Sequence, residues 1–168
     1  MNQARNHRNG RTLGVGCLAA FLLTCHHATA AGQSPKPCAL FTKQAAEAIF
    51  GAPLDPGHAT VVSCTYAGAG GDDQKGLMFN LIPASGTSPG MSMSETYDNL
   101  IHQDPTSTAV PINGMGEKAH YVTSQDHSQA AVEVLYHNTI VGILATSSNN
   151  PNLKTALIDA VRQMMRKL

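Results

Sequence analysis

Apolar residues recur along the chain with two spacings, one typical of helices and one typical of strands. From Thr42 to Gly51 the spacing is helical, with Ala45, Ile49 and Phe50 on one stripe. Thr42 suits the N-terminal cap of a helix, and Gly51 suits its end. We therefore expect the first helix of the folded domain between these two residues.

Two alternating segments follow and predict strands. Between 59 and 68, Val62, Cys64 and Tyr66 fall on one face of an extended chain. Between 77 and 83, alternate residues are again apolar. Because only a glycine-rich link separates the segments, we expect an antiparallel hairpin.

Further strands are expected nearer the C-terminus. Gly114 and Gly116 mark a turn that leads into one strand. The apolar segment 131–146 is interpreted as two strands that turn near His137 and Asn138.

Two more helices are expected in the same half of the chain. Ser92 and Glu95 have the spacing of a capping box, and apolar residues continue at helical spacing to Ile101. A C-terminal helix is expected with Asn150 as its cap and Pro151 at its first position.

The order of these elements predicts an α+β fold. We expect a single antiparallel sheet of about five strands, with N-terminal, middle and C-terminal helices on one face. The other face of the sheet would then remain solvated or available to a partner.

The first 30 residues have the pattern of a secretory signal peptide. Three arginines precede an uncharged run of eleven residues, Leu13 to Leu23, and Ala28-Thr29-Ala30 forms a cleavage site. The run is shorter than the roughly 20 apolar residues of a membrane-spanning helix, so no stable membrane span is expected. We predict a signal peptide at 1–30, a linker at 31–37 and one domain at 38–168, periplasmic or secreted.

A lipid anchor is the alternative for the N-terminus. Cys25 would be the lipidated residue, although Thr24 stands where a lipobox has a smaller residue.

Removal of residues 1–30 leaves 8 Lys and Arg against 11 Asp and Glu. This acidic balance argues against a nucleic-acid partner, which needs a clustered basic surface.

The cysteines predict one disulfide. Cys17 and Cys25 lie in the signal peptide, so Cys38 and Cys64 are the two thiols of the exported domain. In an oxidising compartment they are expected to pair and to tie the first helix to the first strand. A reactive or metal-binding thiol pair is the competing interpretation.

Several short motifs resemble a family of exported bacterial envelope proteins of unknown function, many of them lipoproteins. They are the cysteine-led helix at 38–51, the C-x-Y strand at 64–66 and the segment "GMGEKAHY" at 114–121. The resemblance covers most of the domain and implies export and the disulfide, but no catalytic residues.

Candidate metal ligands are few and match no known spacing. Met91, Met93 and Met115 could bind Cu(I) through their thioether sulfurs, as in a small copper-binding protein. A second set of possible ligands consists of His120, Asp126, His127 and His137. The simpler interpretations are core packing for the methionines and a solvated hairpin for the second set.

The sequence therefore predicts an exported, non-enzymatic binding or scaffolding domain. No nucleophile motif or paired carboxylates are present. We expect no catalytic, metal or cofactor site, and as partner an unidentified envelope protein or small molecule.

Overall fold

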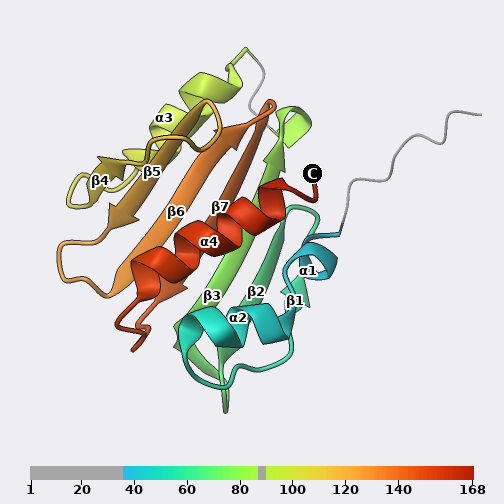
Figure 1. Ribbon diagram of the computed structural model, residues 1–168, viewed down its shortest axis with the longest axis vertical. Helices are drawn as coiled ribbons and strands as arrows, with labels where there is room; N and C mark the ends of the chain where they lie inside the picture. The colour runs from blue at the N-terminus through green and yellow to red at the C-terminus, as the bar shows by residue number, and fades with distance from the viewer. Residues whose placement is uncertain (1–35, 87–89) are drawn as a thin grey trace, which may run out of the picture. The chain divides into compact units, whose positions relative to one another are not determined.

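The computed structural model describes residues 36–86 and 90–168 (Figure 1). The expected signal peptide, the possible lipidation site Cys25 and most of the expected linker lie outside the described residues. Pro37, placed in that linker by the sequence, is the first residue of a short helix and is buried.

One antiparallel sheet organises the described residues. Its seven strands are ordered β1-β2-β3-β7-β6-β5-β4. The strands are β1 (His58–Ala59), β2 (Ser63–Gly68), β3 (Asp72–Pro83), β4 (Thr108–Pro111), β5 (Lys118–Thr123), β6 (Gln129–Tyr136) and β7 (Thr139–Thr146). The hairpin of β2 with β3, and that of β6 with β7, confirm the two strand pairs predicted from the sequence.

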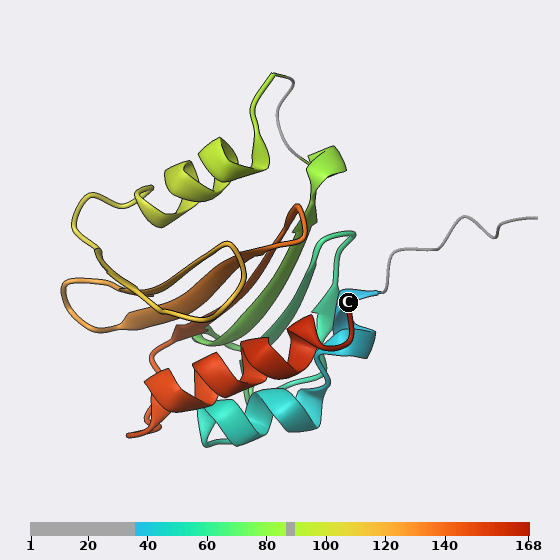
Figure 2. The ribbon, with the colours of Figure 1, turned by 45° about the horizontal axis from the view of Figure 1, so that its top comes forward.

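Four α-helices and one 3-10 turn, η1 (Ala84–Gly86), accompany the described strands. The helices are α1 (Pro37–Leu40), α2 (Lys43–Phe50), α3 (Met93–Ile101) and α4 (Leu153–Met165). Figure 2 shows α2 and α4 together on one side of the sheet and α3 on the other. The prediction that the helices share one face is therefore wrong.

Each face of the sheet has its own hydrophobic cluster. On the α4 face, Phe79, Val132 and Ile143 pack with Leu157 and Val161 of α4. The opposite face, here the α3 face, carries a smaller cluster formed by Met93, Tyr97, Ile101, Leu135 and Ile140. Since side chains alternate along a strand, neighbouring residues of β6 and β7 contribute to opposite clusters.

The disulfide between Cys38 and Cys64 is present, with 5.0 Å between the Cα atoms. It joins α1 to β2. Tyr66 reinforces the same junction, because its hydroxyl donates a hydrogen bond to the carbonyl oxygen of Phe41, 2.5 Å away. Phe41 is 1% exposed, and its ring meets that of Tyr66 edge to face and that of Phe79 at a tilt.

The helix starts confirm two predictions, and the burial pattern of α2 corrects another. Thr42 caps α2 through the amide of Ala45, and Ser92 with Glu95 forms the capping box of α3. The buried alanine of α2 is Ala46, whereas Ala45 is exposed.

The C-terminal helix begins at Leu153, two residues after Pro151. The side chain of Asn150 also makes a contact outside this segment. Its Nδ2 donates to the carbonyl oxygen of Ile49 over 2.6 Å, which joins this segment to the end of α2. Its Oδ1 accepts from the amide of Asn152 over 2.8 Å.

Candidate functional site

A pocket of about 340 Å³ lies on the α4 face, beyond the end of α4. We call it the end pocket. Its apolar lining consists of Val61, Val62, Leu81, Pro83, Tyr136 and Leu168. The polar lining residues are Ser85, His137 and Thr139.

The link between β1 and β2 forms one wall of the end pocket. The hydroxyl of Thr60 accepts hydrogen bonds from the amides of Ser63, at 2.9 Å, and Val62, at 3.3 Å, which folds the link back on itself. The amide of Leu81 then donates to the carbonyl oxygen of Val62 over 2.7 Å. These bonds leave Val61 at the tip of the link, 93% exposed.

The turn between β6 and β7 forms the opposite wall. His137 and Asn138 both have positive φ, 46° and 59°, as a two-residue type I′ turn requires. The carboxylate of Glu117 accepts a hydrogen bond from the amide of His137 over 3.0 Å. Tyr136 and Thr139 are a cross-strand pair at the base of this turn.

Exposed apolar side chains concentrate at the end pocket. Among the described residues, the large hydrophobic side chains that remain exposed are Val61, Met91, Val110 and Leu168. Val61 and Leu168 both line the pocket. Its titratable lining side chains are Tyr136 and His137, and no carboxylate side chain accompanies them. The pocket is therefore suited to holding an apolar group rather than to acid–base chemistry.

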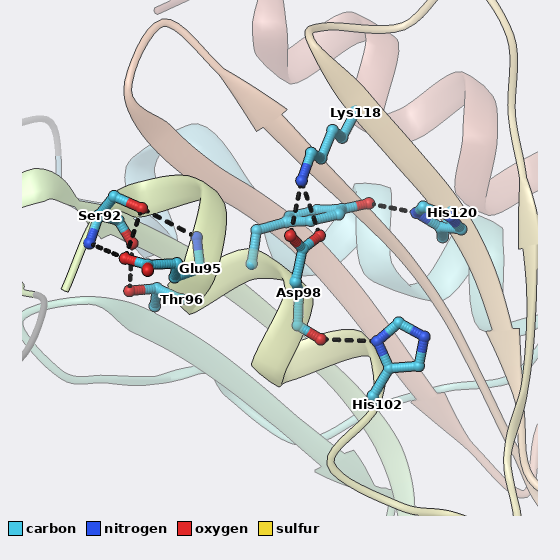
Figure 3. A network of polar contacts seen from close by, with 8 residues as sticks. Ser92, Glu95, Thr96, Asp98, His102, Lys118 and His120 are labelled. Carbon is cyan, nitrogen blue, oxygen red and sulfur yellow. Dashed lines mark hydrogen bonds and ion pairs between the residues drawn. The ribbon is translucent and has the colours of Figure 1, made fainter.

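A polar cluster lies on the other face, beneath α3, and Figure 3 shows its member His120 near the ion pair of Asp98 with Lys118. We call Tyr97, His120 and Glu133 the α3 cluster. The hydroxyl of Tyr97 is 2.8 Å from Nδ1 of His120 and donates to the carbonyl oxygen of Glu133 over 3.0 Å. Since a carbonyl oxygen only accepts, the phenol proton lies toward Glu133, and Nδ1 of His120 carries the hydrogen donated to Tyr97.

Glu133 is the buried acid of the α3 cluster. The residue is 6% exposed, and its Oε2 is fully buried without a hydrogen-bond partner. Burial raises the pKa of this carboxyl group to about 8. Its cross-strand neighbour on β7 is Gly142, which leaves space for the carboxyl group.

Burial also shifts the pKa values of the other two members of the α3 cluster, His120 and Tyr97. The pKa of His120 is lowered by burial and then by the charge of His102. The pKa of Tyr97 is raised by burial and by the nearby carboxylates of Glu133 and Asp98. Both side chains are therefore neutral at pH 7.

One ion pair ties α3 to β5 beside this cluster. Nζ of Lys118 lies 2.8 Å and 2.7 Å from the two carboxylate oxygens of Asp98. Nδ1 of His102, at the end of α3, donates to the carbonyl oxygen of Asp98 over 2.8 Å. The ammonium group of Lys118 is thus engaged with Asp98.

The structure does not bring the three candidate copper ligands together. Met93 belongs to the cluster on the α3 face, whereas Met115 is 3% exposed in the cluster on the α4 face. Met91 is 38% exposed, and its sulfur accepts a hydrogen bond from Asn99. The sheet therefore separates two of the sulfurs that the copper hypothesis needs close together.

The second candidate set is also dispersed. His120 lies under α3, Asp126 and His127 lie between β5 and β6, and His137 lies at the opposite end of β6. The Asp126 carboxylate accepts hydrogen bonds from Ser124 and Ser128, which lower its pKa to about 2. In residues 36–86 and 90–168, no three His, Cys, Asp or Glu side chains are arranged to hold a metal ion.

Neither Glu133 nor the end pocket was predicted from the sequence. A signal for Glu133 was present, because it interrupts an otherwise apolar segment from Ala130 to Leu135. Glu133 falls on the same strand face as Ala131 and Leu135, both of which are buried. The end pocket has no local signal, because its walls come from segments far apart in the sequence.

Comparison with known proteins gives no match to a family model, a curated protein or a solved structure. Within the described part of the chain, no helix has both the length and the apolar character needed to cross a membrane.

Proposed function

We propose that this protein is an exported, non-enzymatic binding domain that holds an apolar ligand, or an apolar group of a larger partner, in the end pocket. The observation that supports the proposal is the position of Val61 and Leu168. Two exposed hydrophobic side chains at one mostly apolar pocket mark an interaction surface, because soluble domains normally avoid grouping such residues.

The volume and the lining of the pocket support a binding role. About 340 Å³ is at the lower end of the range for small-molecule sites. Ser85, His137 and Thr139 could orient a polar end of the ligand, while the valines, Leu81 and Pro83 receive its apolar part.

The disulfide supports the proposed location in the periplasm or outside the cell. Bonds of this kind persist in oxidising compartments and are rare in the cytosol. The proposal includes signal-peptide cleavage before Ala31. The mass of the exported protein tests this step, since a diacylglyceryl group on Cys25 would instead indicate the lipid-anchored alternative.

A neutral fluorescent probe tests binding at the end pocket. N-phenyl-1-naphthylamine should bind the wild-type protein saturably, at one site. Val61→Asp should weaken binding by about tenfold or more, because a carboxylate would be placed against the apolar ligand. Val61 is 93% exposed, so the substitution should leave the fold intact.

Val110→Asp is the matched control. Val110 is an exposed valine on β4, outside the lining of the end pocket. Its substitution should leave probe affinity unchanged. Equal affinities for wild type and Val61→Asp, or an equal loss in both variants, would contradict the proposal.

A further inference from the structure

The carboxyl group of Glu133 is buried beneath α3 without a compensating charge. Its Oε2 has no hydrogen-bond partner, and the residue is 6% exposed. An ionised carboxylate in such a place is costly, whereas a neutral carboxylic acid is tolerated. The α3 face therefore favours the protonated form of Glu133.

At pH 7 the charged and titratable groups around Glu133 provide no counter-charge for its carboxylate. α3 contributes Tyr97 and Asp98, His102 follows directly after this helix, and β5 contributes Lys118 and His120. Lys118 is paired with Asp98 through both carboxylate oxygens, and burial lowers the pKa of His120, so that its imidazole is neutral at pH 7. On the β7 and β3 side, the same row of the sheet continues with Gly142 and Asn80, neither of which is charged.

The helix that covers Glu133 is short and has few attachments. α3 has nine residues, so it is not expected to be stable away from the sheet. Tyr97 bonds to the backbone of Glu133 itself, Asp98 pairs with Lys118, and Met93 and Ile101 pack on the sheet. The attachment through Tyr97 thus places the helix directly over the buried acid.

We propose that Glu133 is a proton-controlled latch for α3. With the proton bound, α3 lies on the sheet and covers the neutral acid. When the proton is lost, α3 separates from the sheet and the carboxylate becomes hydrated. Opening then exposes Leu135 and Ile140 of the α3 face. The latch is independent of the end pocket, which lies on the other face.

The expected pH dependence follows from the two states of Glu133. In the open state the carboxyl group has an ordinary pKa near 4.5, whereas in the closed state its pKa is about 8. The equilibrium constant for opening should therefore rise by roughly tenfold per pH unit between about pH 5 and pH 8. Below and above this window it should be nearly constant.

Amide hydrogen exchange followed by mass spectrometry tests the latch on the exported protein. The amide exchange rate of the segment Met93–Ile101 in wild type is divided by the rate of the same segment in Glu133→Gln at the same pH. This division cancels the pH dependence of the intrinsic exchange reaction. This ratio should rise by roughly tenfold per pH unit from pH 5.5 to 7.5. Asp159→Asn, which removes an exposed carboxylate from α4, should behave as wild type.

The wild-type protein provides a second test that needs no variant. The rate for α3 is compared with the rate for β7 in the same sample at each pH. The latch predicts that α3 exchanges faster than β7 at every pH after correction for intrinsic amide rates, because opening of α3 leaves the strands of the sheet paired. Equal protection of the two segments, or equal exchange in wild type and Glu133→Gln at every pH, would overturn the proposal.

Discussion

The carboxyl group of Glu133 occupies the space that a side chain at position 142 would fill. Glu133 and Gly142 are cross-strand partners on β6 and β7, and a Cβ atom added to Gly142 would overlap both carboxyl oxygens. Gly142 is therefore required here by close approach rather than by backbone conformation. The buried position of the Glu133 carboxyl group therefore depends on the absence of a side chain at Gly142.

Gly142→Ala should destabilise the protein by about 1–3 kcal/mol, because the added Cβ would displace the buried carboxyl group of Glu133 from its place on the α3 face. Urea unfolding measures this loss. In a Glu133→Ala background the overlap is absent, and the same substitution should cost little, since alanine is otherwise better than glycine in a strand. An equal cost in both backgrounds would show that contact with Glu133 is not the cause.

Stability should depend on pH through Glu133. Its pKa is raised on folding, from 4.5 to about 8, so its protonated form favours the folded state. The stability contributed by the proton is complete below about pH 4.5 and is lost as the pH rises to about 8. A tenfold change in proton affinity corresponds to about 1.4 kcal/mol, so wild type should lose a few kcal/mol relative to Glu133→Gln over this range.

Urea unfolding of both proteins at pH 5 and pH 8 measures that difference. His120 acts in the opposite direction, since its lowered pKa reduces stability as the pH falls. This effect is present in both proteins and cancels in the comparison. A stability difference that is the same at both pH values would mean that Glu133 is ionised in the folded protein.

Some parts of the fold could be predicted from local patterns in the sequence. Ser92 with Glu95, and His137 with Asn138, are local patterns, so the start of α3 and the turn after β6 were predictable. Cys38 and Cys64 were predictable because the expected export left no other pairing. In each case, neighbouring residues or a simple count determined the result.

Other features depend on tertiary contacts. The strands β1 and β4 have two and four residues, too few to show alternation, so the sequence predicts only about five strands. Helical spacing identifies α3, but it carries no information about which sheet face the helix covers. The bond from the Asn150 side chain to the carbonyl oxygen of Ile49 could not be predicted either, because the two residues lie far apart along the chain.

The disulfide should contribute about 3 kcal/mol, because it closes a loop with a sequence separation of 26 residues. Replacing Cys38 and Cys64 together by alanine should lower the melting temperature by several degrees. Affinity for the neutral probe should persist below the transition, since neither cysteine lines the end pocket. An unchanged melting temperature, or two free thiols in the oxidised protein, would contradict this assignment.

Methyl NMR of the protein during titration with N-phenyl-1-naphthylamine tests the proposed binding role most directly. The methyl signals of Val61, Val62 and Leu81 should shift together and saturate at one equivalent of probe. Those of Val110 on β4 and of Leu135 on the α3 face should stay in place. Shifts that occur at Val110 or Leu135 but not at Val61, Val62 and Leu81 would contradict the end pocket as the binding site, as would no saturable shifts at all.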